Sequence, residues 1–160
     1  MFENLFSLKG RVALVTGGSR GIGRMIVSGF LAYGAERIYI TARKAQACDE
    51  AAAELTKIGP GKVISLPGDI STLEGVEKLA AELKGREEKL DILVNNAGAA
   101  WAADFEEFPE KGWDKVVDLN LKTPFFLTKA LAPLLRKAAT KERPAKVINI
   151  ASIDGIFVNP

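Results

Sequence analysis

The sequence contains no histidine and a single cysteine, Cys48, among its 160 residues. Without histidine, the Ser-His-Asp arrangement of hydrolases and most zinc sites are excluded. A lone cysteine cannot form an internal disulfide, and a thiol nucleophile needs a base that the chain does not offer. We therefore interpret Cys48 as a small residue packed in a helix, and we expect a reducing compartment and no metal site.

Neither sign of charge dominates, since 22 basic residues stand against 20 acidic ones and the net charge is +2. This balance leaves no electrostatic footprint for nucleic acid or an acidic membrane surface. No apolar run approaches the roughly 18 residues of a membrane-spanning helix, and the first residues are too few and too polar for a signal peptide. We expect a cytoplasmic protein without a nucleic-acid or membrane partner.

What the chain does have is a regular alternation of short β-branched runs and longer helical patterns. Strands are expected over residues 11–16, 37–41, 62–66, 91–94 and 146–151. Helices are expected over residues 21–33, 45–58, 111–121 and 124–138, and after a capping box at residues 71–74. Apolar strands separated by helices are typical of a parallel sheet covered on both faces, so we predict an α/β domain of three layers.

A glycine-rich turn follows the first predicted strand and precedes the first predicted helix. Residues 16–23 read T-G-G-S-R-G-I-G. Glycines let the backbone turn sharply and approach a pyrophosphate, and the amides at the start of the helix then hold the anion. Strand, turn and helix together predict a dinucleotide site in a doubly wound parallel sheet of the Rossmann type. The residues of this turn expected to bind the cofactor are Gly17, Ser19, Arg20, Gly21, Ile22 and Gly23.

Residues after the second predicted strand decide between NAD and NADP. A carboxylate about twenty positions after the glycines would bind the ribose hydroxyl of NAD, whereas an arginine accommodates the 2′-phosphate of NADP. This turn has no carboxylate but has Arg43, and Arg20 supplies a second cation from the glycine-rich turn. The alternative is that both arginines are merely solvated. The absence of a carboxylate and the presence of Arg43 both favour NADP(H) over NAD(H).

Several segments together resemble the short-chain dehydrogenase/reductase family. The glycine-rich turn has that family's T-G-x-x-x-G-I-G spacing rather than G-x-G-x-x-G. The other segments that carry the resemblance are 91–98 with its N-N-A-G sequence, the pairs Ala100-Trp101 and Gly112-Trp113, and 145–152. The resemblance extends from Lys9 to the last strand. Within the family it points to the branch of NADPH-dependent 3-oxoacyl-[acyl-carrier-protein] reductases of the rhamnolipid-biosynthesis type.

The resemblance implies further cofactor contacts. Asp69 is expected to contact the adenine ring with Ile70 packed beside it, although Asp69 by itself could equally be a turn residue. In the N-N-A-G segment, Asn96, Ala97 and Gly98 are expected to line the cofactor cleft. Asparagine amides there can also bridge the backbones of neighbouring strands, so we expect structural and binding roles together.

Two residues are predicted to be catalytic. The resemblance implies that Asn120 helps to hold a water molecule for a proton relay; a solvated helix face is the alternative. Ser152 follows the fifth predicted strand, and ligands of open α/β sheets bind outside the carboxyl ends of strands. A hydroxyl there can orient a carbonyl and stabilise its developing oxyanion, although it could also be a turn cap. By resemblance, Ser152 is the family's catalytic serine.

The chain departs from the family pattern at the family's acid, a tyrosine in a Tyr-x-x-x-Lys motif beyond the serine. Its only tyrosines are Tyr33 and Tyr39, and the sequence ends at Pro160. Tyr39 and Arg43 have the spacing of the motif, but residues four apart in a strand lie roughly 13 Å from each other. We therefore expect residues 1–160 to be an incomplete NAD(P)-binding domain, truncated after the fifth strand.

The resemblance implies an NADP(H)-dependent oxidoreductase that reduces a carbonyl substrate, such as a 3-oxoacyl group, to an alcohol by hydride transfer. Its full-length form is expected to be a homodimer or homotetramer. One alternative is a dinucleotide-binding fragment without activity, and another is a fragment with no independent fold. Without a sixth strand and its helix, the fifth strand would be an exposed edge. The apolar residues then expected to be bare include Phe125, Phe126, Leu131, Leu134 and Leu135.

Overall fold

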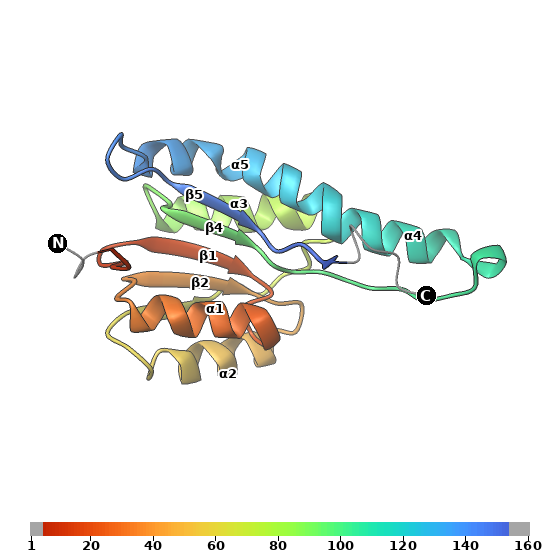
Figure 1. Cartoon of the computed structure of the whole chain (residues 1–160), viewed down its shortest axis with the longest axis horizontal. Helices are drawn as coiled ribbons and strands as arrows, with labels where there is room; N and C mark the ends of the chain where they lie inside the picture. Colours follow the sequence, from red (N-terminus) through yellow and green to blue (C-terminus); the bar gives the residue numbers. More distant parts are fainter. Residues whose placement is uncertain (1–4, 154–160) are drawn as a thin grey trace.

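The computed structural model describes residues 5–153, which form one parallel sheet between two layers of helices (Figure 1). The strands are β1 (Val12–Thr16), β2 (Arg37–Thr41), β3 (Lys62–Ser65), β4 (Ile92–Asn95) and β5 (Lys146–Asn149). The helices are α1 (Gly21–Ala32), α2 (Ala45–Leu55), α3 (Leu73–Arg86), α4 (Glu110–Val117) and α5 (Thr123–Ala138). Short turns η1 (Phe105–Glu107) and η2 (Asp118–Lys122) flank α4. The order across the sheet is β3-β2-β1-β4-β5, which confirms the predicted doubly wound fold.

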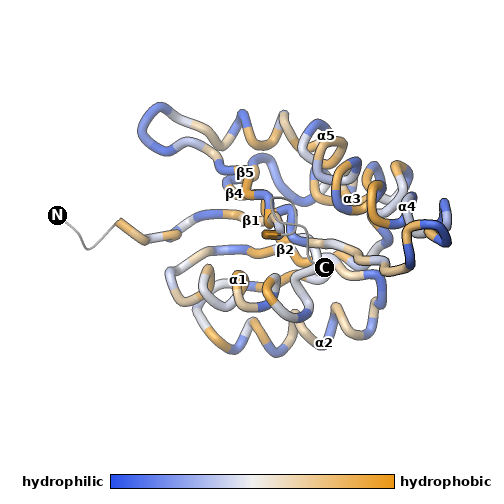
Figure 2. Tube along the Cα trace, turned by 45° about the vertical axis from the view of Figure 1, so that its right-hand side comes forward, coloured by the Kyte–Doolittle hydropathy of each residue, from blue (hydrophilic) through white to orange (hydrophobic). Residues whose placement is uncertain are grey.

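The sheet separates two hydrophobic cores. Successive residues of a strand point to opposite faces, so Ala13 and Val15 of β1 pack under α1 and α2, whereas Val12 and Leu14 pack under α3 and α5. Hydrophobic colour accordingly follows the central strands between the two helical layers (Figure 2). Burial on both faces explains why the strands are apolar throughout.

The strand order reverses between β1 and β4, whose carboxyl ends therefore lie side by side with no helix crossing over them. This is the place where open α/β sheets bind their ligands. On the far side of β4, β5 pairs in parallel, and the Ile150 N–H extends the ladder by donating to the Asn95 carbonyl (2.9 Å). In Figure 1 the chain after β4 runs past this edge of the sheet to α4.

The two helices predicted over 111–121 and 124–138 are in fact one unbroken helix, so that prediction was wrong. The π-helical turn η2 joins α4 directly to α5, and the Thr123 N–H donates to the Asp118 carbonyl five residues back. Pro124 has no N–H and must interrupt the hydrogen-bond ladder of any helix. The wider π turn accommodates this interruption without ending the helix.

The predicted capping box was also wrong by one position. The N-cap of α3 is Thr72, whose hydroxyl accepts from the Gly75 N–H (3.1 Å). Ser71 instead lies in the turn before the helix, where its N–H and its hydroxyl both donate to Asp69 (3.0 and 2.8 Å). The residue at the third helical position is therefore Gly75, and no glutamate completes the box.

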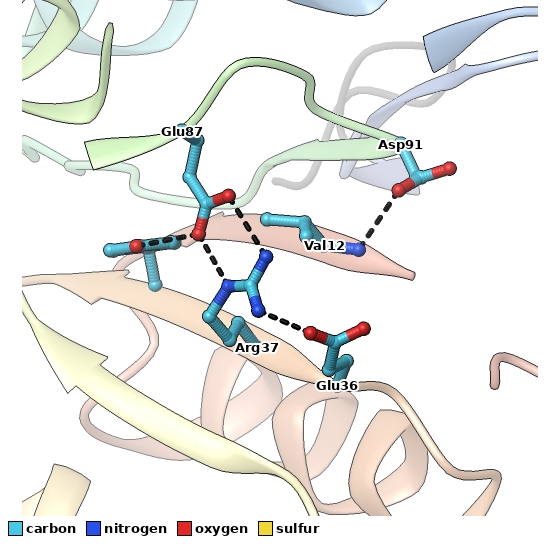
Figure 3. Close-up of polar contacts among 6 residues, drawn as sticks. Val12, Glu36, Arg37, Glu87 and Asp91 are labelled. Atoms are coloured by element: carbon cyan, nitrogen blue, oxygen red, sulfur yellow. Dashed lines mark hydrogen bonds and ion pairs between the residues drawn. The ribbon is translucent and has the colours of Figure 1, made fainter. Parts of the chain in front are cut away.

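The amino edge of the sheet is held by charged groups that sequence reasoning did not anticipate (Figure 3). Glu87, at the end of α3, is only 8% exposed and accepts two bonds from the Arg37 guanidinium (2.6 and 3.1 Å). It also accepts from the Tyr39 hydroxyl (2.8 Å). Asp91 accepts from the Val12 N–H (3.0 Å) and thereby ties the starts of β1 and β4 together. These bonds stabilise the edge opposite to the ligand edge.

The prediction of bare apolar residues on the last helix was largely wrong. Leu131, Leu134 and Leu135 are buried, because that face of α5 packs on α3. Phe126 is half-buried, and only Phe125, at 65% exposure, conforms to the expectation. The strand β5 is exposed along its length, as expected. Among residues 5–153, no helix combines the length and the apolar character needed to cross a bilayer.

Candidate functional site

The glycine-rich turn forms a cradle in which side chains have no room. Gly17 has a φ of +66°, in the left-handed region that favours glycine. A Cβ on Gly23 would lie 2.3 Å from the Gly17 carbonyl oxygen and 2.5 Å from Nδ2 of Asn96. A Cβ on Gly18 would lie 2.6 Å from the Ile40 side chain. Sequence reasoning treated Gly18 as variable, because its constraint comes from the neighbouring strand.

The start of α1 lies in this cradle and leaves its first amides available. Arg20 is the N-cap residue in extended conformation, and its side chain does not cap the helix. Thr72 caps α3, whereas α2 and α4, like α1, have no side-chain cap. Uncapped N–H groups and the positive end of the helix dipole together suit an anion. Arg20, Gly21 and Ile22 are exposed here, and Ser19 is half-buried.

The N-N-A-G segment locks β4 to the glycine-rich turn. Nδ2 of Asn96 donates to the carbonyls of Thr16 (2.8 Å) and Gly17 (3.3 Å). The backbone N–H groups of Asn96 and Ala97 both donate to the Thr16 hydroxyl, each at 2.9 Å. The expected bridging role of the asparagine amide is thus present in the structure. Thr16 itself was missed as a site residue; a hydroxyl at the end of an otherwise apolar strand was the available signal.

Arg43 and Asp69 lie on adjacent turns, after β2 and β3. The Gly68 N–H donates to the Ala42 carbonyl (3.0 Å), and this bond joins the two turns one residue away from each side chain. Both side chains are exposed. The Ser71 N–H lowers the pKa of Asp69, and the Ser71 hydroxyl and the Arg43 charge lower it further against partial burial. Asp69 is therefore an anion at neutral pH.

Ile70, next to Asp69, is 4% exposed and belongs to the core under α3 and α5. Its carbonyl accepts a hydrogen bond from the Thr123 hydroxyl at the start of α5. Ile70 thus connects the turn after β3 to α5, and its expected contact with an adenine ring stays a prediction.

Asn120 lies on η2, and both ends of its side-chain amide bond to the loop that leaves β4. Its Oδ1 accepts from the Ala99 N–H (2.8 Å), and its Nδ2 donates to the Ala99 carbonyl (2.9 Å). A Cβ on Gly98 would lie 3.5 Å from the same Oδ1. The side chain therefore positions the loop, and its expected part in holding a water molecule stays a prediction.

The loop is anchored a second time by Trp101, whose ring covers Gly112 of α4. A Cβ on Gly112 would lie 2.7 Å from that ring, and the Lys115 ammonium lies 5.0 Å from the ring centroid. Trp101 and Gly112, one residue from each of the two pairs, thus meet. The sequence showed both pairs but not that they meet.

Ser152 lies at the carboxyl edge but not directly at the end of a strand. The strand β5 ends at Asn149, and Ser152 is exposed two residues beyond the last ladder bond at Ile150. The predicted strand, 146–151, was thus two residues too long. In β4 and β5, Asn95 donates through Nδ2 to Oδ1 of Asn149 (2.8 Å), which fixes the backbone leading to the serine.

Cys48 has the structural role that the sequence suggested. It is fully buried in α2, and its thiol lies 3.5 Å from the Ile40 carbonyl. Burial raises the pKa of this thiol, which makes it less reactive.

The edge as a whole fits a dinucleotide. Three glycines leave room for a pyrophosphate against the start of α1, with Gly23 in contact with Asn96. Arg20 lies in the glycine-rich turn itself and Arg43 in the turn after β2, and within residues 5–153 neither forms an ion pair. Two guanidinium groups of this kind suit a phosphate.

Comparison with known proteins agrees with this geometry. The family model described as short chain dehydrogenase matches residues 11–160. A rhamnolipids biosynthesis 3-oxoacyl-[acyl-carrier-protein] reductase from Pseudomonas aeruginosa is 50% identical over 94% of this chain and 58% of its own length. An NAD-dependent glycerol dehydrogenase from Listeria innocua is 34% identical over 94% of this chain and 56% of its own length.

A solved structure, the Pseudomonas aeruginosa RhlG/NADP active-site complex, superposes on this chain with a TM-score of 0.91. The two are 48% identical, and the match covers 97% of this chain and 59% of the other. The chain therefore spans less than two thirds of the length of the relatives it matches.

Proposed function

Since the chain belongs to the short-chain dehydrogenase family, we propose that residues 1–160 form the NADP(H)-binding part of an oxidoreductase that reduces a carbonyl group to an alcohol. The observation that carries this proposal is the cradle of Gly17, Gly23 and Asn96 at the reversal of strand order. Bound NADPH would supply a hydride there. The protein's part would be to bind and orient NADPH and the substrate and to exclude water.

The proposed binding roles follow from the positions of the residues. The amides at the start of α1 and the Arg20 side chain would hold the pyrophosphate. Arg43, after β2, would bind the 2′-phosphate, and Asp69, after β3, would face the adenine. Asn96, Ala97 and Gly98 would line the cleft between β1 and β4. A preference for NADP(H) is supported by Arg43 and by the NADP complex of the similar reductase.

The proposed catalytic roles concern Ser152 and Asn120. Ser152 would orient the substrate oxygen by donating a hydrogen bond to it. Asn120 would position the loop through Ala99 and help to hold a water molecule for a proton relay. The substrate class we propose is a 3-oxoacyl group, because the relative that is 50% identical is a 3-oxoacyl-[acyl-carrier-protein] reductase. We propose a homodimer or homotetramer for the longer form.

The second candidate function is dinucleotide binding without turnover. The two tyrosines of the chain are Tyr33 and Tyr39, and the Tyr39 hydroxyl is engaged by Glu87 at the opposite edge. Neither can pass a proton to a substrate beside Ser152. We therefore expect the 160-residue chain to bind NADPH but not to oxidise it in the presence of a ketone.

Arg43→Asp tests the cofactor assignment. We expect this change to weaken the binding of NADPH by about tenfold or more and the binding of NADH by much less, because only NADPH carries the 2′-phosphate. The measurement is a fluorescence titration of the chain with each nucleotide. Lys57→Asp, which makes the same charge change beyond the other end of α2, should affect neither. Equal losses for both nucleotides would contradict the assignment, and absence of saturable binding would contradict the binding site itself.

A further inference from the structure

Adjacent turns place a fixed anion beside the residue assigned to the 2′-phosphate. Arg43 follows β2, and Asp69 follows β3, its neighbour in the sheet. The bond from the Gly68 N–H to the Ala42 carbonyl (3.0 Å) holds the two turns together, with Arg43 and Asp69 next to its two ends. Any group bound by Arg43 at this edge therefore lies within the field of the Asp69 carboxylate.

The charge of Asp69 is held in place by its own turn. Its Oδ1 accepts from both the N–H and the hydroxyl of Ser71 (3.0 and 2.8 Å). These two donors fix the orientation of the carboxylate and favour its ionised form, so the pKa of Asp69 is lowered. The Arg43 charge on the adjacent turn lowers the pKa of Asp69 in the same direction.

On the basis of the proposed function, we propose that Asp69 is a specificity-determining residue that limits the preference for NADPH over NADH. A phosphate with about two negative charges that approaches Arg43 is repelled by the neighbouring carboxylate. NADH lacks that phosphate and does not experience the repulsion. The preference supplied by Arg20 and Arg43 is thus reduced by a fixed charge beside them.

This effect can be separated from an adenine contact, because adenine is common to both nucleotides. Loss of such a contact weakens NADPH and NADH equally and leaves the ratio of their dissociation constants unchanged. Loss of the negative charge changes the ratio. Both side chains are exposed, so water and salt reduce the interaction. We expect a change in the ratio of about two- to fivefold.

Asp69→Asn is the direct test. Asparagine keeps an oxygen that can accept from the Ser71 N–H, so the turn and the fold are retained, which circular dichroism can verify. NADPH and NADH titrations of the 160-residue chain should show an NADH-to-NADPH ratio of dissociation constants about two- to fivefold higher than in the wild type. The increase should shrink at high ionic strength. An unchanged or lower ratio would overturn the proposal.

Two control variants distinguish the explanations. Ser71→Ala removes one hydrogen bond to Asp69 but keeps its charge, so the ratio should not change. Glu88→Gln makes the same change of net charge at the amino edge of the sheet and should also leave the ratio unchanged. A response to Glu88→Gln equal to that of Asp69→Asn would overturn the local explanation. If the wild type bound neither nucleotide, the proposed function itself would fail, whereas binding with an unaltered ratio defeats only the role of Asp69.

Discussion

A methyl group on Gly23 would meet the Gly17 carbonyl on one side and the Asn96 amide on the other. Neither neighbour can move easily, because Asn96 is bonded to Thr16 and Gly17 belongs to the same tight turn. Gly29, on the same helix, has no atom within 4 Å of its would-be Cβ. Gly23 and Gly29, two of the three glycines of α1, therefore differ in what they exclude.

Gly23→Ala should destabilise the chain by about 1–3 kcal/mol, because the added carbon overpacks the cradle. It should also abolish NADPH binding, since the start of α1 must move. Urea unfolding and nucleotide titration measure the two effects. The matched control is Gly29→Ala, which should stabilise the chain by about 0.5–1 kcal/mol through helix propensity. Equal stability of the two variants would show that the contacts at Gly23 are not restrictive.

The features of the candidate site that follow from the sequence alone are those set by local backbone geometry. Gly17, Gly21 and Gly23 have a spacing that a strand, turn and helix explain. Gly18 and Asn120 could not be explained in this way, because Ile40 and Ala99, the groups that constrain them, are brought close only by the fold. Long-range contacts of this kind leave no periodic signal in one sequence.

Among the elements, β2 and α3 are joined through the buried phenol of Tyr39. Burial, together with the hydrogen bond to the Glu87 carboxylate, raises the pKa of Tyr39 to about 12. The ordinary tyrosine pKa is about 10, so the protonated phenol is favoured in the folded state. The stabilisation is complete below the unfolded pKa and is lost as the pH rises through the folded pKa.

Between pH 10 and pH 12 the chain should therefore lose about 2–3 kcal/mol of its free energy of unfolding through this one group. Lysines also titrate in this range, so the comparison with Tyr39→Phe isolates the effect. Urea unfolding at several alkaline pH values should show a steeper decline for the wild type than for Tyr39→Phe. Parallel declines would mean that the phenol titrates alike in both states.

The boundaries of the elements were predicted less well than their existence. Ser71 has good capping chemistry, but Asp69 competes for its hydroxyl and its N–H, so the cap moves to Thr72. Pro124 is typical of a helix start, but the π turn η2 lets α4 continue into α5. In both cases two local rules compete, and the three-dimensional structure follows the one that the sequence interpretation did not favour.

At the scale of the molecule, the two cores lie on opposite faces of one sheet. One edge strand of that sheet is β5. The inner face of α5 is covered by α3, so its leucines are buried. The other face of α5 and the strand β5 together present a groove of about 490 Å³, lined in part by Leu121, Phe125 and Val147. The sequence predicted this exposed edge but not which side of α5 it would include, because helical periodicity does not identify the packing partner.

This apolar face should make the 160-residue chain associate with itself. Leu121 is 70% exposed and Phe125 is 65% exposed, so burial of Phe125 in an interface contributes about 1–2 kcal/mol. Phe125→Gln should therefore weaken self-association by about tenfold, and a second change, Leu121→Gln, should weaken it further. Light scattering coupled to size-exclusion chromatography over a concentration series measures the change. Met25→Gln on α1, where the side chain is 72% exposed, is the matched control and should leave the association unchanged. If Met25→Gln weakened association as much as Phe125→Gln, the contact would not be specific to the face of α5 and β5.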